Sequence, residues 1–398
     1  MELTVQQVRA HRLAAHHLVK KLPPAGLLQA AGACGLQNSP PGAWETALFH
    51  RVEGCTLQGL HTALYQEKSL LQAWSYRGAP IIFPTEESCV FLAPLQAKAG
   101  EEPWVYTRGL SAALDFLGLP FGELLPLVKE AAKYLDGHVV KSKEALDAIL
   151  AEAVEKALPE EKRGLWRSPS MYDQTGRQTV GAAVVSFLLR PCSFSSLVVF
   201  GEREGVSPTF TSFQNWVGHA PLQVPEAEKK LARKFLHCHG PTTKSAFAAW
   251  LGASPKQAGR LWGCIAEELE PVQIKGRTYH MLSADVKALP GLGQEEGRYL
   301  LLGPHDPYLD TREKALLLAD TALQRAVWKT VANPGAVVYE GRIIGTWKGK
   351  TGRVGLEMAL TLWERAAEKQ EAILKGLAEA YAAFRELPLS KIEMDGLY

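Results

Sequence analysis

Three side chains that bind metals in other proteins stand next to one another at His237, Cys238 and His239. Imidazole and thiolate groups are ligands that Zn²⁺ prefers. This string, however, closes a helical pattern just before Gly240-Pro241, and no second group of such residues follows it in the sequence. We therefore predict that the protein holds no metal and needs no cofactor.

Two carboxylates, Asp306 and Asp310, lie in and directly after the motif HDPYL. A carboxylate can serve as a general base in catalysis. An aspartate before a proline also favours a turn, because its side chain hydrogen-bonds to the backbone two residues further on. Turn formation explains Asp306 adequately, so neither carboxylate is assigned a catalytic role.

The composition is that of a globular protein. The chain has 398 residues, of which 46% are hydrophobic and 22% charged, and this length favours two or three packed units. The six cysteines are scattered without CxxC spacing, which favours reduced thiols over a disulfide framework. No apolar stretch is long enough for a signal peptide or a membrane span. We expect a soluble, cytoplasmic protein that contacts no membrane.

The net charge of +2 gives no global basic field. If nucleic acid is the partner, a local basic surface has to attract it while acidic residues lie elsewhere. The charge balance therefore neither supports nor excludes DNA binding.

Residues 225–282 carry the clearest structural pattern. Ala227, Leu231 and Phe235 recur every four residues, which predicts a helix with one buried face. A second helix follows, and its closing Gly252 suits the left-handed conformation at a helix C-terminus.

A third helix is predicted to begin at Ser254. Serine is a good N-cap residue, Pro255 fits the first helical position, and Gln257 would complete a capping box. Two short strands follow, PVQI and RTYHML, joined by a tight turn at Lys275-Gly276. The apolar side chains that we expect to be buried together are those of Trp250, Leu261, Trp262 and Ile265.

Three helices followed by a two-stranded hairpin form a winged helix. As a DNA-binding unit it would place Lys256 and Arg260 of the third helix in a major groove, and Lys275 and Arg277 of the hairpin on the DNA backbone. A winged helix used only for packing is the alternative. For one copy taken alone, the two interpretations are equally supported.

The same order recurs more weakly in two other segments. The N-terminal segment shows four helical patterns and then a strand pair that turns at Arg77-Gly78. Between residues 121 and 211, two helical patterns precede a segment in which we interpret the turn at residues 173–177 as a wing tip. Arg190 adds positive charge there. The further DNA contacts that we predict from these segments are Arg77, Arg167 and Arg177.

From Arg298 onward, short apolar runs separated by Gly and Pro predict a small sheet or barrel, followed by a closing helix docked on the body. We therefore expect an α+β fold of tandem winged-helix units with a C-terminal β-rich region and a terminal helix. The expected units are residues 1–100, 101–224 with a long wing, 225–290, and the C-terminal region 291–398.

Several short motifs follow one another in a characteristic order. They are Gly35-Leu36-Gln37, Tyr76-Arg77-Gly78 with Phe83-Pro84, Pro208-Thr209-Phe210 before Trp216, and the strings at residues 239–252, 305–309 and 341–349. In this order and spacing, nearly the whole chain resembles the AlkZ/YcaQ-like winged-helix DNA glycosylases. The resemblance implies three tandem winged helices in a C-shaped arrangement and a hydrolase that needs no metal or cofactor.

The resemblance also points to two site residues. Members of that family use a Gln-x-Gln or Gln-x-Asp motif beside the scissile N-glycosidic bond, so Gln37 matches the first position and Ser39 occupies the second. The family's first wing commonly reads Arg-Gly-Thr-x-His, whereas Arg77-Gly78 is followed here by Ala79, Pro80 and Ile81. Both departures lie at positions linked to catalysis.

Removing a base from deoxyribose develops positive charge on the sugar, and water has to be held on its far face. A carboxylate could activate that water, whereas the amide of Gln37 can only position it, and the hydroxyl of Ser39 is no base near neutral pH. Alkylated purines leave as cationic bases and need less help, so Gln37 and Ser39 could suffice for them. A purely structural role for Gln37, hydrogen-bonding loop carbonyls before Pro40-Pro41, is the alternative.

Three functions are therefore in competition. The leading one is a monofunctional DNA N-glycosylase, or its degenerate descendant, that acts on alkylated double-stranded DNA as a monomer and lies at the nucleoid when bound. The second is a non-catalytic DNA-binding protein with a regulatory or protective role. The third is a structural interaction module that does not bind DNA.

Overall fold

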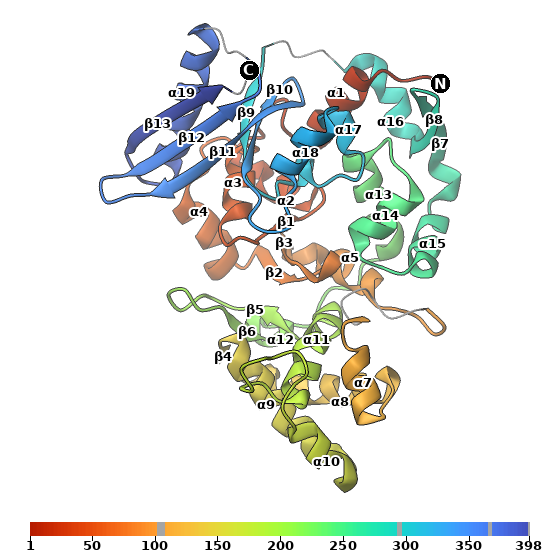
Figure 1. Ribbon diagram of the computed structural model, residues 1–398. Coiled ribbons are helices and arrows are strands. Elements are labelled where there is room, and N and C mark those ends of the chain that lie inside the picture. Colours follow the sequence, from red (N-terminus) through yellow and green to blue (C-terminus); the bar gives the residue numbers. More distant parts are fainter. Residues whose placement is uncertain (102–107, 293–296, 365–367, 397–398) are drawn as a thin grey trace. The chain divides into compact units, whose positions relative to one another are not determined.

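The computed structural model describes residues 1–101, 108–292, 297–364 and 368–396 (Figure 1). It is a mixed α+β fold, about half helical, with small sheets. The chain divides into two compact units, and the division falls within two of its helices. Unit 1 comprises Met1–Thr62, Ala232–Phe247 and Ile265–Tyr398, and unit 2 comprises Ala63–Leu231 and Ala248–Cys264.

Unit 1 begins with short helices. These elements are α1 (Val5–Ala15), α2 (Leu27–Gly32), β1 (Leu36–Gln37), α3 (Ala43–Phe49) and α4 (Leu57–His61). A full capping box starts α1, because Thr4 and Gln7 each accept a hydrogen bond from the other's backbone N–H. The helix ends at Ala15, and His16 is its C-cap residue.

A five-stranded sheet forms the C-terminal part of unit 1. Its strands are β9 (Tyr299–Leu302), β10 (Gly335–Tyr339), β11 (Arg342–Thr351), β12 (Leu356–Leu362) and β13 (Leu389–Gly396), in the order β13-β12-β11-β10-β9. All described pairings are antiparallel except that of β12 with β13, which α19 (Glu368–Phe384) connects. The predicted sheet and helix are thus confirmed, but a strand that the sequence did not suggest follows the helix.

Both faces of this sheet are buried around β9 and β10. Along β10, Val337 packs with Leu374 and Ala378 of α19, which covers one face (Figure 1). Its neighbour Val338 packs on the opposite face with Leu13 of α1. Because side chains alternate across a strand, β10 can be apolar at every position and still fill two cores. Unit 1 also contains the short helices α16 (Ser283–Ala288), α17 (Lys314–Leu317) and α18 (Thr321–Val327).

An ion pair inside unit 1 joins α3 to the turn that follows β9. The Arg51 guanidinium donates to both carboxylate oxygens of Asp306 at 2.7 and 2.8 Å, and both side chains are at most 2% exposed. Asp306 also accepts from the N–H of Tyr308 at 3.0 Å, which is the turn bond expected from the sequence. The aspartate therefore does more than form a turn: it neutralises a buried cation.

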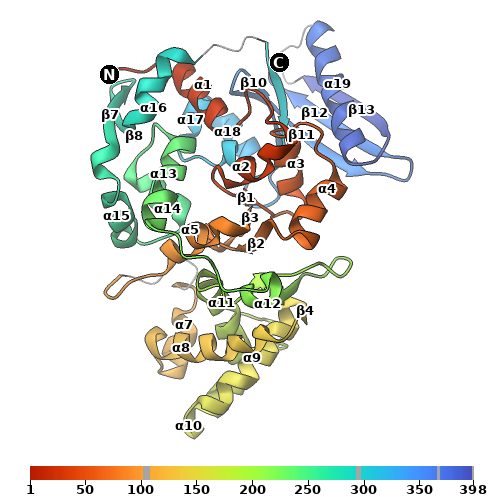
Figure 2. The same cartoon turned by 180° about the vertical axis from the view of Figure 1, so that it is seen from behind.

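Unit 2 is mainly helical (Figures 1 and 2). Its elements up to residue 231 are β2 (Leu70–Trp74), β3 (Pro80–Pro84), α5 (Ser88–Leu92), α7 (Ser111–Leu117), α8 (Phe121–Ala132), β4 (Val140–Lys141), α9 (Lys143–Ala157), α10 (Glu160–Arg167), α11 (Val180–Phe194), β5 (Val199–Phe200), β6 (Thr209–Thr211) and α12 (Phe213–Val217). Apolar faces of α7, α8, α9 and α11 share one core.

The predicted wing tip at residues 173–177 is wrong. That turn leads into α11, whose N-cap Thr179 accepts from the N–H of Ala182. The turn itself is closed by the carboxylate of Asp173, which accepts from three backbone N–H groups. The apolar run that follows is short enough to be a buried strand or a buried helix, and burial among α8 and α9 decides for the helix.

No single described helix is long and apolar enough to cross a membrane. One bent pair, Ser111–Leu117 with Phe121–Asp136, satisfies the length and composition requirements together. Its apolar side chains, among them Leu117, Leu124 and Val128, lie in the core of unit 2.

The helix order predicted for residues 225–282 is confirmed. The elements are α13 (Ala227–His239), α14 (Lys244–Leu251), α15 (Pro255–Gly263), β7 (Leu269–Ile274) and β8 (Arg277–Leu282). Ser254 caps α15 as expected, and Gly252 has the predicted positive φ of +70°. Lys275 and Gly276 both have positive φ and form the tight hairpin turn.

Two details of this segment differ from prediction. The Gln257 side chain does not complete a capping box but donates to the carbonyls of Pro94 and Leu95. Trp262 is half-buried, whereas Trp250, Leu261 and Ile265 are each at most 4% exposed. An indole ring has a large apolar surface and one polar N–H, so Trp262 can lie at the edge of the buried face of its helix. The division into winged-helix units stays a prediction.

The first expected outcome concerns the buried ion pair. Asp306→Ala leaves the Arg51 guanidinium buried without its carboxylate, so the free energy of unfolding should fall by about 3–5 kcal/mol. Urea denaturation monitored by tryptophan fluorescence measures this. The matched control is Glu393→Ala, which breaks the exposed pair with Lys391 and should leave the free energy of unfolding nearly unchanged. Equal losses in the two variants would contradict the special role of the buried pair.

Candidate active site and DNA-contacting residues

The loop after α2 carries the two predicted catalytic residues. Gln37 ends β1 and is half-buried, whereas Ser39 is exposed. The Gln37 Nε2 donates to the Ser39 carbonyl at 3.1 Å. This bond fixes the plane of the amide and turns its Oε1 away from that carbonyl. The structure thus brings Gln37 and Ser39 together through a side-chain-to-backbone bond, which is also the structural role that the sequence left open.

The same loop is closed by a second local bond. Asn38 Oδ1 accepts from the N–H of Gly42 at 2.8 Å. Gly42 has a φ of +90° and is the N-cap residue of α3, and a Cβ at this position would lie 3.2 Å from a carboxylate oxygen of Glu45. Glycine is therefore required both by the backbone conformation and by the close approach of that carboxylate.

Glu45 is a nearly buried carboxylate beside this loop, and no sequence motif predicts it. Its side chain lies 2.9 Å from His61 Nε2 and accepts from Arg385 Nη1 at 2.6 Å. Burial alone would raise the pKa of Glu45, but the hydrogen bonds from His61 and Arg385 outweigh it and the pKa lies below its usual value. The group is therefore ionised at neutral pH. An exposed His61 and a helix-end Arg385 are ordinary surface residues in the sequence, so only the fold reveals this cluster.

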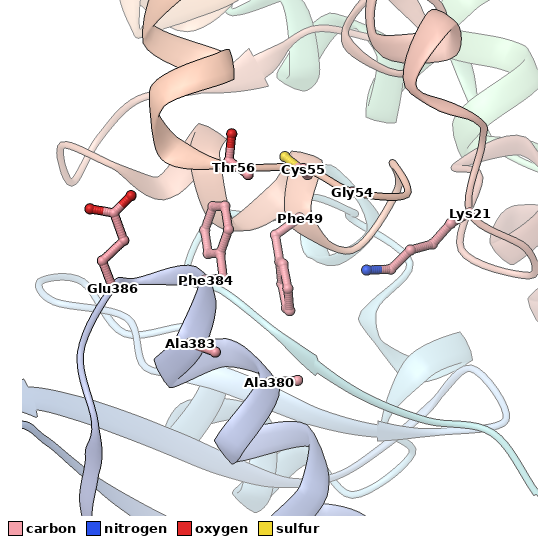
Figure 3. A pocket seen from close by; sticks show the side chains of 9 residues that line it. All are labelled: Lys21, Phe49, Gly54, Cys55, Thr56, Ala380, Ala383, Phe384 and Glu386. Atoms are coloured by element: carbon pink, nitrogen blue, oxygen red, sulfur yellow. The ribbon is translucent and has the colours of Figure 1, made fainter.

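A hollow of about 370 Å³ lies elsewhere in unit 1, between the loop before α4 and the end of α19 (Figure 3). Phe49 and Phe384 stack on each other in its wall with ring centroids 4.6 Å apart, and the Lys21 ammonium lies 4.4 Å from the Phe49 centroid. Among the described residues that line it, neither Gln37 nor Ser39 is found. The hollow is therefore separate from the candidate catalytic loop.

Three of the predicted DNA contacts in unit 2 are engaged in the protein itself. Arg77 donates to the Trp250 carbonyl at 3.1 Å. The Lys256 ammonium donates to the Gly100 carbonyl at 2.6 Å. Arg260 lies 2.6 Å from carboxylate oxygens of both Glu101 and Glu228, so its charge is compensated.

The other unit 2 candidates are more exposed. Arg177 is exposed at the turn that Asp173 closes. Arg167 is 70% exposed at the end of α10 and pairs with Glu155. In both views α10 lies at the end of unit 2 opposite the β2–β3 hairpin that carries Arg77 (Figures 1 and 2). Within this unit the predicted cations thus do not form one cluster.

Lys275 and Arg277 belong to unit 1. Both are exposed at the tip of the β7–β8 hairpin. The backbone N–H of Lys275 donates to Glu2 at 3.1 Å and so anchors the turn. The Lys275 side chain itself is exposed to solvent. Because the predicted cations are divided between the two units, a single positive face that contains all of them stays a prediction.

The comparisons with known proteins agree on one family. The family model described as DNA glycosylase AlkZ-like matches residues 30–384. The solved structure of the Streptomyces sahachiroi DNA glycosylase AlkZ is similar over 100% of both chains, with a TM-score of 0.76 and 22% sequence identity. No curated protein matches the chain.

The fold is that of a DNA glycosylase of the AlkZ structure type, with a loop-borne glutamine at the candidate site. The family match covers most of the chain, so this protein belongs to the AlkZ-like DNA glycosylase family. The resemblance inferred from its motifs is thereby confirmed. The match to the solved structure, at this level of identity, establishes the fold.

The pairing of Glu45 with His61 can be tested through the pKa of His61. The hydrogen bond that His61 donates to Glu45 raises the pKa of His61 above 6.5. A raised histidine pKa means that the stabilisation by this pair is complete below the unfolded pKa and is lost as pH rises through the folded value. In Glu45→Gln, the pKa of His61 followed by NMR should fall toward 6.5. The control Glu53→Gln, an exposed carboxylate of unit 1, should leave it unchanged, and a His61 pKa insensitive to Glu45→Gln would refute the pairing.

Proposed function

We propose that this protein binds double-stranded DNA and hydrolyses the N-glycosidic bond of alkylated bases. The observation that carries the proposal is the fixed amide of Gln37 in the loop at the family's first motif position, held by its bond to the Ser39 carbonyl. An amide that is oriented in advance can place a water molecule without losing side-chain freedom during the reaction.

In the proposed reaction, water held by Gln37 adds its oxygen to C1′ of the deoxyribose as the C1′–N bond breaks. The bonding electron pair leaves with the base, and the water's extra proton passes to solvent. A cationic N-alkylpurine becomes neutral on leaving, so no general acid is needed. Ser39 can donate or accept a hydrogen bond at this site but cannot take up the proton near neutral pH.

Glu45 lies against Gly42 at the end of the same loop and stays ionised because His61 and Arg385 hold it. The same two partners balance its charge, so it supplies no net negative charge to the reaction. Its two hydrogen-bonded partners make it a poor proton acceptor, so we assign it no base role.

The activity prediction uses methylated duplex DNA. Gln37→Ala should reduce base release to the uncatalysed background and leave duplex affinity nearly unchanged, because phosphate contacts dominate binding. Ser39→Asp or Ser39→Gln, which restores the family pattern, should raise the rate. Strand cleavage by heat or alkali after the reaction reports base release, and uracil-containing or undamaged duplex should resist.

The matched control is Gln29→Ala, an exposed glutamine on the preceding helix α2. It should behave as the parent protein does. Equal background release by the parent and by Gln37→Ala would reject the enzyme. Retained duplex binding in that case would support the non-catalytic DNA-binding protein, for which the unusual Ser39 is the favouring observation.

A separate prediction concerns the DNA-binding surface. Lys275→Ala with Arg277→Ala removes two exposed charges at one hairpin tip and should weaken duplex binding for all sequences. The slope of log affinity against log salt should become shallower by up to about 2, since each phosphate contact contributes roughly 0.9. Fluorescence anisotropy at several salt concentrations measures both quantities.

The control for this measurement is Lys133→Ala with Lys156→Ala. These exposed lysines pair with Glu130 and Glu152 one helical turn away, so they have the same charge but carry no predicted DNA contact. An unchanged salt slope in the hairpin variant would show that Lys275 and Arg277 are ordinary solvated charges. Absence of any salt-dependent affinity in the parent would favour the interaction module.

A further inference from the structure

Two groups of metal-binding side chains come together in unit 1. The first consists of His11, His237 and Asp285, and the second of His16, Cys34 and Cys238. In the first group His237 Nδ1 lies 2.9 Å from Asp285 Oδ1, and His11 Nε2 lies 2.9 Å from the His237 carbonyl. These hydrogen bonds account for the first group without an ion.

The second group is different because it is fully buried and rich in sulfur. A ring nitrogen of His16 and the two sulfur atoms of Cys34 and Cys238 all lie within 4.8 Å of one another. His239 adds a fourth side chain: its ring centroid is 5.4 Å from that of His16, and it hydrogen-bonds to Cys34. All four residues are at most 2% exposed.

Three separate segments supply these side chains. His16 is the C-cap residue of α1, Cys34 follows α2, and Cys238 and His239 end α13. The Cys238 sulfur lies 3.8 and 3.5 Å from the carbonyls of Ala15 and Ala33. The ends of α1, α2 and α13 therefore meet at these side chains.

One ring nitrogen of this group is open to an ion. His16 Nε2 is buried and has no hydrogen-bond partner within the described part of the chain. A buried polar atom without a partner is costly and calls for an explanation.

We propose that His16, Cys34, Cys238 and His239 form a buried structural zinc site that joins α1, the loop after α2 and the end of α13. Two thiolates and two imidazoles are a ligand set typical of tetrahedral Zn²⁺. With Zn–S near 2.3 Å and Zn–N near 2.0 Å, neighbouring ligand atoms are about 3.3–3.8 Å apart. The ligand atoms of His16, Cys34 and Cys238, which lie within 4.8 Å of one another, are close to this spacing, and His239 would supply the fourth ligand from beside Cys34.

Binding would exchange protons for the metal. The hydrogen bond with Cys238, followed by burial, raises the pKa of Cys34 well above 9.0, so without an ion it is a thiol. A cysteine ligates Zn²⁺ as a thiolate, so each thiol that binds the ion gives one proton to solvent, and two such losses balance the charge of Zn²⁺. Nothing is oxidised or reduced in this exchange.

The test uses the full, untagged chain, reduced and stripped of metal with a chelator. Titration with Zn²⁺ should reach one ion per chain by elemental analysis and raise the Tm. Titration with Co²⁺ should give the intense visible bands of a tetrahedral ion and a sulfur-to-cobalt charge-transfer band in the near ultraviolet. Because these spectra need no variant, the proposal can be tested even where a substitution prevents folding.

Cys34→Ala and Cys238→Ala should each abolish the charge-transfer band or halve it, and His16→Gln should weaken Zn²⁺ binding. The matched control is Cys192→Ala, a cysteine of unit 2 that is equally buried, which should bind as the parent does. A second control, His11→Gln, probes the hydrogen-bonded group and should also retain zinc. Failure of the reduced parent chain to bind Zn²⁺ or Co²⁺, or a Cys34–Cys238 disulfide in place of metal after reduction and dialysis against Zn²⁺, overturns the proposal.

Discussion

Arg51 and Asp306 are far apart in the sequence, yet their side chains form a two-point ion pair from which water is almost excluded. A guanidinium stays protonated at any physiological pH, and a lone buried charge is strongly destabilising. Helix α3 and the turn after β9 therefore have to reach their positions together. Arg51 also donates to the Ala47 carbonyl at 2.8 Å, which ties the pair to the end of α3 itself. The candidate catalytic loop directly precedes α3 and so lies next to this anchor.

A second buried guanidinium organises the end of α13. Arg12 donates to the carbonyls of His239, Gly240 and Pro241 at 2.6, 3.2 and 2.9 Å, and Glu313 lies 3.5 Å away. Carbonyls at a helix C-terminus lack intrahelical partners, and one planar, five-donor group can satisfy several of them. The same helix end supplies two of the four side chains of the proposed zinc site. Arginine and the proposed metal would thus stabilise one junction from two sides.

Charge compensation separates the cations of this protein into two kinds. Arg260 and Arg77 are used for contacts within unit 2, so replacing them would disturb packing as well as any DNA surface. Lys275 and Arg277 are exposed on a hairpin tip that backbone pairing already holds in place. Binding to a phosphate backbone needs exposed cations such as these two, because a guanidinium that exchanges a carboxylate for a phosphate gains little electrostatic energy.

Much of the local structure was determined by the sequence itself. Neighbouring residues in the chain determine the four-residue period of α13, the Ser254 cap and the turn at Lys275-Gly276, and the structure confirms all three. The family match likewise confirms the resemblance that the motif order indicated. Only the tertiary structure decided which distant groups meet. Gln257 donates to the carbonyls of Pro94 and Leu95 instead of completing a capping box, and Glu45 accepts a hydrogen bond from Arg385. Cys34 came to lie beside Cys238 in the same way. A polar side chain binds whichever partner the folded backbone brings within about 3 Å, and sequence spacing does not encode that distance.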